Sequence, residues 1–297
     1  MNGTKEAGKI SNFFSRCFNY VYRKKYEKLV KQKIVGERKT SMSDDNKYPM
    51  FCDIASENKM IFKTFRRNSI YNEILEHVTQ EEGQKYLDII NNNKLVKFDE
   101  ADWQNFCLND LCGKPYMFPY EINGHITDIS PTTMRYAKVL SDIITLFDTE
   151  KINKVAEIGI GYAGQCRMLM SYMKNIEKYS LYDLPEVLKL AKRYLNEVHD
   201  ISKIEFIDGT NIQKEGKYDF VISNYAFSEL VREVQDIYLK NVILKAKAGY
   251  ITWNALSRDV LDGYSVEQLL EIIPGSSVID EKPLTAPENC IIIWGNK

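Results

Sequence analysis

Hydrophobic and polar positions change their spacing at about residue 151. Beyond that point, five short apolar runs alternate with stretches whose apolar residues fall at helical spacing. The runs lie at 154–159, 179–183, 203–208, 218–224 and 249–254. This alternation predicts parallel strands joined by right-handed crossover helices. Two more strands, at 276–282 and 290–295, are joined by a short connection, so residues 151–297 predict a doubly wound α/β sheet of seven strands.

Helical spacing also dominates the chain before the sheet. From residue 51 to 150 the apolar residues recur every three to four positions, as in the stretch 69–90. Strand-like alternation is scarce, so we predict an all-helical substrate or lid region. It ends in an aromatic, turn-rich piece before a helix that starts at 131–133. The polar stretch 36–49 has the composition of a linker.

The charge of the chain is unevenly distributed. The net charge is −1 over 297 residues, but the first 40 residues hold eleven lysines and arginines against three glutamates, a net charge of +8. Residues 10–34 read as a basic amphipathic helix. The role of this helix stays open. It could pack on its own domain or on a partner subunit, as in a homo-oligomer, or bind peripherally to an anionic membrane. Nucleic acid is not predicted as a partner.

Several classes of protein are disfavoured by composition. No apolar run approaches the roughly 18 residues of a membrane span, and the amino terminus lacks the apolar core of a secretion signal, so we expect a cytoplasmic protein. Six scattered cysteines form no C-x-x-C pair and favour reduced, buried thiols over structural zinc. The sequence holds no compact cluster of carboxylates that would require a metal ion, and no metal site is predicted.

A glycine motif follows the first predicted strand of the sheet. Gly159, Gly161 and Gly164 form G-x-G-x-x-G. A glycine-rich turn lets the backbone approach a ligand, and the free N–H groups of the following helix favour negative charge. The pyrophosphate of NAD and the carboxylate of S-adenosylmethionine both suit such a turn. The glycines alone therefore do not separate an oxidoreductase from a methyltransferase.

Three acids around the motif favour S-adenosylmethionine. Glu157 precedes the glycines at a position that is usually apolar in dinucleotide-binding strands, and we expect it near the amino group of the ligand. Asp183, at the end of the second strand, can accept hydrogen bonds from ribose hydroxyls, which suits either cofactor. Asp208, at the end of the third, is expected to contact the adenine amino group. Beyond residue 151 there is also no room for a second, catalytic domain.

Longer segments carry a family resemblance. EIGIGYAGQ, LYDLPEVLKLAKRYL, DFVISNYAFSELVREVQDIYLKNV, GYITWN and EKPLTAPENCIIIWG together resemble the sugar O-methyltransferase family found with polysaccharide and capsule gene sets, as does the upstream ISPTTMRYAKVL. The resemblance covers about residues 51–295. It implies a Rossmann-like class I core that transfers a methyl group from S-adenosylmethionine to a hydroxyl of a sugar, nucleotide sugar or glycan. A methyltransferase for an amine or other small molecule is the alternative, and an NAD-dependent oxidoreductase is less favoured.

The motifs and the resemblance together give a set of cofactor-binding residues. They are Glu157, Gly159, Gly161, Gly164, Gln165, Asp183, Leu184, Asp208, Gly209, Asn224 and Tyr136.

A general base is the next requirement, because an alcohol is a poor nucleophile while protonated. Glu229 is the first choice, since it projects from the start of a helix after the fourth strand, although an acid there can merely complement the helix dipole. His125 is the rival, in a loop expected to fold over the cleft, with a pKa suited to proton transfer. Arg135 is expected to bind a carboxylate or phosphate. The substrate-binding candidates are Tyr225, Ser228, Arg232, Arg135, Tyr120 and Trp253.

Overall fold

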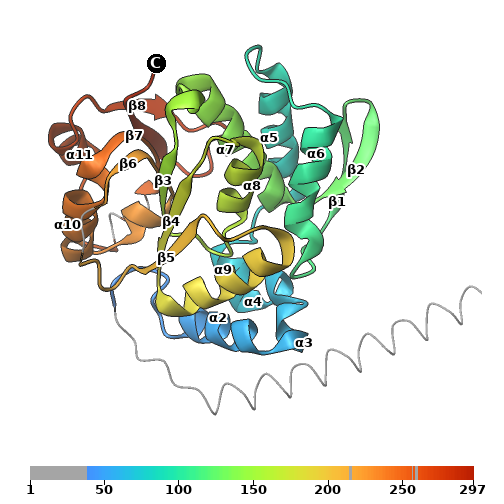
Figure 1. Cartoon of the computed structure of the whole chain (residues 1–297), viewed down its shortest axis with the longest axis horizontal. Coiled ribbons are helices and arrows are strands. Elements are labelled where there is room, and N and C mark those ends of the chain that lie inside the picture. The colour runs from blue at the N-terminus through green and yellow to red at the C-terminus, as the bar shows by residue number, and fades with distance from the viewer. Residues whose placement is uncertain (1–38, 214–215, 256, 258–259) are drawn as a thin grey trace, which may run out of the picture.

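Seven strands form one central sheet in the computed structural model, which describes residues 39–213, 216–255, 257 and 260–297 (Figure 1). Their order is β5-β4-β3-β6-β7-β9-β8. Strands β3 to β7 run parallel, whereas β9 is antiparallel to both β7 and β8. The strands are β3 (Lys154–Ile158), β4 (Lys178–Asp183), β5 (Ile204–Asp208), β6 (Tyr218–Asn224), β7 (Ala246–Trp253), β8 (Ser277–Asp280) and β9 (Cys290–Trp294). The predicted seven-stranded α/β sheet is confirmed.

Helices cover both faces of this sheet because successive strand residues point to opposite sides. On β3, Val155 packs into one apolar cluster, and its neighbour Ala156 packs into the other. The first cluster includes residues of α7 (Pro131–Leu146), α8 (Gly164–Tyr172) and α9 (Pro185–Val198). The second includes residues of α10 (Arg232–Asn241) and α11 (Val266–Ile272). The sheet is therefore doubly wound, and its carboxyl edge is left for a ligand.

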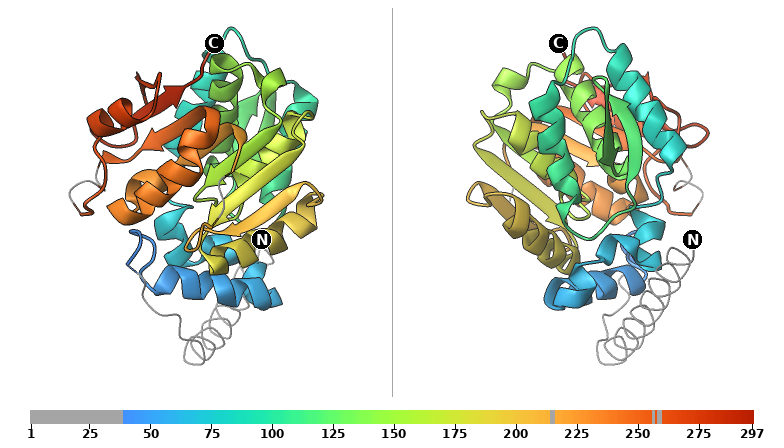
Figure 2. Two further views of the ribbon diagram at one scale, coloured as in Figure 1. Left: turned by 60° about the vertical axis from the view of Figure 1, so that its left-hand side comes forward. Right: turned by 90° about the vertical axis from the view of Figure 1, so that its right-hand side faces the viewer.

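Five helices precede α7 in the described part of the chain. They are α2 (Lys47–Glu57), α3 (Lys59–Phe62), α4 (Ser69–Ile74), α5 (Gln80–Asn92) and α6 (Glu100–Cys107). Short 3-10 helices lie at η1 (Phe65–Arg67), η2 (Leu108–Leu111), η3 (Thr149–Lys151), η4 (Ala226–Glu229) and η5 (Ile243–Lys245). Helix α2 packs along α9, and α5 packs along α7 (Figures 1 and 2). None of the helices described is long and apolar enough to cross a membrane.

The prediction that residues 51–150 are all helical was wrong at one place. Strands β1 (Phe118–Ile122) and β2 (His125–Ile129) form an antiparallel hairpin, which lies beside α5 and α6 in Figure 1. Asn123 and Gly124 connect them with φ values of 51° and 81°. An Asn-Gly pair at positive φ is the favoured two-residue hairpin turn. The signal was therefore in the sequence, but the prolines and aromatic residues around it concealed the alternation.

The segment before α2 is also more ordered than its linker-like composition predicted. Ser41 forms an isolated β-bridge with Leu230. The backbone N–H of Val231 donates to the carbonyl of Thr40 at 3.1 Å, and the N–H of Met42 donates to the carbonyl of Glu229 at 3.0 Å. A polar composition indicates only that a segment buries little apolar surface. It does not predict these contacts, because they are hydrogen bonds of the backbone. The predicted basic helix at 10–34 lies outside the described residues.

Candidate active site

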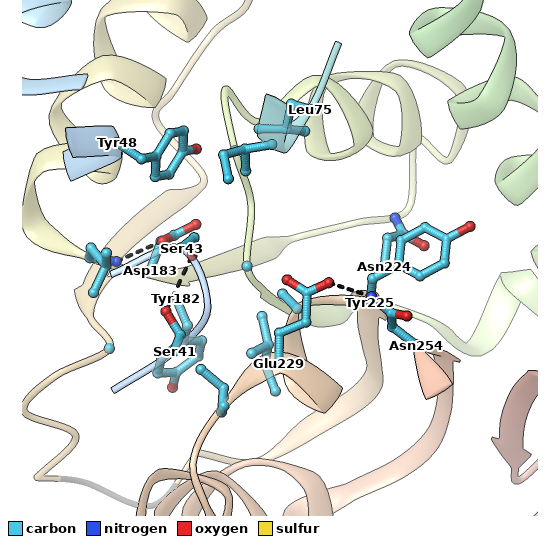
Figure 3. Close-up of a pocket in the computed structure, with 18 of the residues that line it drawn as sticks. Ser41, Ser43, Tyr48, Leu75, Tyr182, Asp183, Asn224, Tyr225, Glu229 and Asn254 are labelled. Atoms are coloured by element: carbon cyan, nitrogen blue, oxygen red, sulfur yellow. Dashed lines mark hydrogen bonds between the residues drawn. The ribbon is translucent and has the colours of Figure 1, made fainter. Parts of the chain in front are cut away.

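A cavity of about 370 Å³ lies at the carboxyl edge of β3, β4 and β6, where ligands bind in open α/β sheets. Figure 3 shows Tyr182 and Asp183 at one end of it, Asn224 and Tyr225 at the other, and Glu229 between them. The opposite wall comes from the segment before α2, from the start of α2, and from α4, α5 and the turn between them. Its residues are Thr40, Ser41, Ser43, Tyr48, Ile74, Leu75, His77, Val78, Glu82 and Tyr86. The volume is in the range of small-molecule sites.

The turn after β3 forms the floor of this cavity. Gly159 and Gly161, both with positive φ, line it as predicted from their spacing. A Cβ on Gly159 would lie 1.9 Å from the Cβ of Ala226, so no larger residue fits there. The third left-handed residue is Ala163, with a φ of 66°. Gly164 instead begins α8, where it makes room for the rings of Tyr136 and Tyr162, and it does not line the cavity.

Asp183 joins the glycine turn to the end of β4. Its carboxylate accepts hydrogen bonds from the backbone N–H groups of Ile160 and Leu184, both at 2.7 Å. Burial raises the pKa of Asp183 to about 6. A carboxylate has about four lone-pair positions, so Asp183 keeps acceptor capacity for ligand hydroxyls. Leu184 and Gly209, also predicted, line the same end of the cavity.

Glu157 lies elsewhere than the sequence predicted. Strand alternation turns its side chain to the face covered by α7 and α8, where it is 2% exposed and does not line the cavity. The hydroxyl of Tyr179 donates to its carboxyl group at 2.7 Å. Burial raises the pKa of Glu157 to about 8. This acid is therefore part of the buried core and does not face the ligand position.

Replacing Glu157 by Gln is expected to stabilise the fold at alkaline pH. Because the pKa of Glu157 is raised from 4.5 to about 8, its contribution to stability is present below pH 4.5 and is lost as the pH rises through 8. The amide keeps an acceptor for Tyr179 and cannot ionise. We expect roughly 3–5 kcal/mol of added stability at pH 9 and little change at pH 4, measured by urea unfolding. The same pH dependence in both proteins would contradict this assignment.

Three further predicted cofactor residues, Asp208, Gln165 and Tyr136, do not line the cavity. The Asp208 carboxylate accepts from the backbone N–H of Thr210 at 2.9 Å and so shapes the turn after β5, without lining the cavity. Gln165 donates to the carbonyl of Tyr136 at 3.4 Å, and both side chains are buried outside the cavity.

Asn224 does face the cavity, and its Oδ1 is buried with no hydrogen-bond partner in the part of the chain that the structure describes.

Glu229 faces the cavity from the end of η4. Tyr225, with a φ of 67°, turns the chain sharply after β6, so that both Tyr225 and Glu229 line the cavity. The Nδ2 of Asn254 donates to the Glu229 carboxyl group at 2.9 Å (Figure 3). Burial raises the pKa of Glu229. Sequence reasoning missed Asn254, although its place directly after β7, at the same sheet edge, was a usable signal.

Several predicted substrate residues do not face the cavity. Trp253 and Tyr120 are buried in the core, the latter donating to the carbonyl of Gln80, so the prediction that they bind substrate was wrong. The hydroxyl of Ser228 supports the turn by donating to the carbonyl of Tyr225. Arg232 donates to the carbonyl of Gly263 at 2.9 Å and lies outside the cavity lining. Aromatic and polar composition did not reveal which side of each element is covered.

His125 begins β2 on the hairpin and is exposed, outside the cavity lining. The prediction that its loop folds over the cleft was wrong, because β1 and β2 pair with each other beside α5 and α6. His77, in the turn between α4 and α5, lines the cavity instead. Burial, and then the charge of Arg135, lowers the pKa of His77. Arg135 itself lines the cavity as predicted.

Comparisons with known proteins were also made. No protein-family model matches the chain, and no curated protein sequence matches it. Similar solved structures include the mitomycin 7-O-methyltransferase MmcR, with 14% identity, a TM-score of 0.40, and coverage of 55% of this chain and 57% of that one. PigF with SAH has 11% identity, a TM-score of 0.40, and coverage of 52% and 60%. The chain therefore spans less than two thirds of either protein.

A third similar structure is the methyltransferase domain of a bacterial CtHen1, with 12% identity, a TM-score of 0.40, and coverage of 54% of this chain and 96% of that one. At these TM-scores the three similarities do not bear on the activity of this chain. Its site must be interpreted from its own residues.

Proposed function

We propose that this chain is an S-adenosylmethionine-dependent O-methyltransferase whose acceptor is a sugar hydroxyl. One juxtaposition carries the proposal: the glycine turn and Asp183 share a single cavity with the half-buried side chain of Glu229. A nucleoside-binding end and a candidate base thus meet at the carboxyl edge of a doubly wound sheet. The family resemblance of the segments from EIGIGYAGQ to the carboxyl-terminal strand supports the choice of a sugar.

The residues present fit the cofactor. Asp183 has acceptor capacity for ribose hydroxyls, and Gly159 and Gly161 present bare backbone to the cavity. The unpartnered Oδ1 of Asn224 suits a donor such as an ammonium group. When bound, S-adenosylmethionine supplies an electrophilic methyl group. Tyr48, on the opposite wall, lines the same end of the cavity as Asp183 (Figure 3).

The chain's own contribution to the reaction is to place the acceptor and to take its proton. We assign proton acceptance to the Glu229 carboxylate, which the Asn254 amide holds at the cavity. The raised pKa of Glu229 strengthens it as a base relative to an exposed carboxylate. Holding the hydroxyl oxygen in line with the methyl group can supply on the order of 7–11 kcal/mol. Tyr86, Tyr225 and Thr285 offer hydroxyl-rich walls for a sugar.

Two measurements test the proposal. Calorimetry compares S-adenosylmethionine and S-adenosylhomocysteine with NAD, and tight NAD binding without adenosyl ligand binding would overturn it. Incubation with methyl-labelled cofactor and a panel of nucleotide sugars, amines and phenols then identifies the acceptor. Label on a sugar is expected, whereas label only on an amine would move the assignment to the alternative class of methyltransferase.

A further inference from the structure

Arg135 presents a buried positive charge to the cavity. It lies in the second turn of α7, is 9% exposed, and lines both the main cavity and a smaller cavity beyond Tyr225. Its Nη2 donates to the carbonyl of Leu75 at 3.5 Å, at the long limit for a hydrogen bond. Its Nε is buried with no partner among the residues that the structure describes. Arginine keeps its charge in proteins, so burial does not neutralise it.

The carboxylates around Arg135 are engaged by other groups. Glu76 forms a 2.6 Å ion pair with Arg66. Glu281 accepts hydrogen bonds from the hydroxyl of Tyr225 and from the backbone N–H of Thr285. Glu82 accepts from the backbone N–H of Thr79 in a helix cap. Across the described ranges, no carboxylate lies within ion-pair distance of Arg135.

Two aromatic rings hold the guanidinium in place. Its Cζ lies 5.8 Å from the ring centroid of Tyr136 and 5.9 Å from that of Tyr225. Contacts with ring faces do not consume the N–H donors of a guanidinium. His77 lines the same cavity, and burial and then the charge of Arg135 lower its pKa. A buried, unpaired cation is costly unless an anion compensates it.

We propose that Arg135 is the anion-binding residue of this cavity and that it pairs with a ligand carboxylate. A planar guanidinium donates two parallel hydrogen bonds to a carboxylate. In Arg135 the Nε has no partner among the described residues, and the Nη2 makes only the long contact with the carbonyl of Leu75. The identity of the carboxylate rests on the proposed function: it belongs either to the amino-acid end of the cofactor or to an acidic sugar acceptor.

The test uses the full chain and calorimetric binding of three probes. S-adenosylhomocysteine carries a carboxylate, 5′-methylthioadenosine is the same nucleoside thioether without the amino-acid group, and glucuronate is a sugar acid. Arg135→Met is compared with the wild type and with Arg67→Met, which removes an exposed arginine outside the cavity. Thermal melting confirms that each variant is folded.

We expect Arg135→Met to weaken the binding of a carboxylate probe by about ten- to a hundredfold. Binding of 5′-methylthioadenosine should stay unchanged, and Arg67→Met should behave as the wild type. Loss for S-adenosylhomocysteine assigns the carboxylate to the cofactor, and loss for glucuronate alone assigns it to the acceptor.

The proposal is overturned if neither carboxylate probe distinguishes Arg135→Met from the wild type, or if 5′-methylthioadenosine binding falls to the same extent. Failure of the proposed function gives a different pattern, in which the wild type binds neither nucleoside. The glucuronate measurement then decides alone: binding that Arg135→Met abolishes supports the anion site, and absence of wild-type binding overturns it.

Discussion

Replacing Glu229 by Gln is expected to lower turnover by about 10²- to 10⁴-fold, the range that a placed general base contributes. The Gln side chain keeps the size of Glu229 and an oxygen that can accept from Asn254, but it cannot take a proton. Binding of S-adenosylhomocysteine should stay within about threefold of the wild type, because the base acts on the acceptor. Rates of labelled methyl transfer and calorimetry measure the two quantities separately.

His125→Gln is the matched comparison, since it removes the rival base predicted from the sequence. His125 lies on the exposed hairpin outside the cavity lining, so we expect near-normal turnover. A large loss in His125→Gln together with a small loss in Glu229→Gln would reverse the assignment.

The pH dependence of turnover gives a second readout for Glu229. Only the ionised carboxyl group accepts a proton, so kcat/KM should fall as the pH drops below the pKa of Glu229. Because burial raises this pKa, the acid limb should lie above the ordinary carboxyl value of 4.5. Glu229→Gln should remove this limb from the residual activity, and an unchanged limb would show that another group titrates.

Replacing Gly159 by Ala is expected to give the largest loss of cofactor binding. The added Cβ would meet the Cβ of Ala226 at 1.9 Å, in a backbone with a φ of 75°. Left-handed strain costs about 1 kcal/mol, and overpacking adds roughly 1–3 kcal/mol. Because the clash lies in the glycine turn, we expect S-adenosylhomocysteine affinity to fall by at least about tenfold. Ala226 also begins η4, which carries Glu229, so we expect a further loss of turnover.

Gly124→Ala is the matched control for Gly159→Ala. Gly124 has a φ of 81°, and a Cβ there would meet nothing within 4 Å, so this variant carries the backbone strain alone. It should lose about 1 kcal/mol of stability and keep its ligand affinity. Adding Ala226→Gly to Gly159→Ala should restore part of the affinity by removing the clash. Equal affinity losses in the two single variants would show that the contact with Ala226 does not matter.

Much of the core could be predicted from the sequence because its signals are local. Apolar runs located all seven strands of the sheet. The strand–turn–helix context placed Gly159, Gly161 and Asp183 at one edge, since parallel strands bring their carboxyl ends together. Glu229 and Asn224 followed from the same rule, because Asn224 ends β6 and Glu229 lies in the η4 segment that follows this strand.

The direction of individual side chains could not be predicted with the same rules. Glu157 is two residues before the glycine turn, but strand alternation points it into the core beside Tyr179. Gly164 completes the spacing of the motif, yet the residue in the left-handed conformation is Ala163. A motif records which residues occur and at what interval, whereas orientation depends on which face each neighbour covers.

The sequence by itself determined the seven-stranded α/β class, the edge of the sheet at which a ligand can bind, and the glycines and acids that come to that edge. Only the tertiary structure decided the opposite wall, where Ser41, Tyr48 and His77 arrive from segments far from β3 in the chain. It also left Arg135 buried without a carboxylate partner among the described residues. Local periodicity follows from neighbouring residues, but a cavity is closed by long-range packing whose partners no local pattern records.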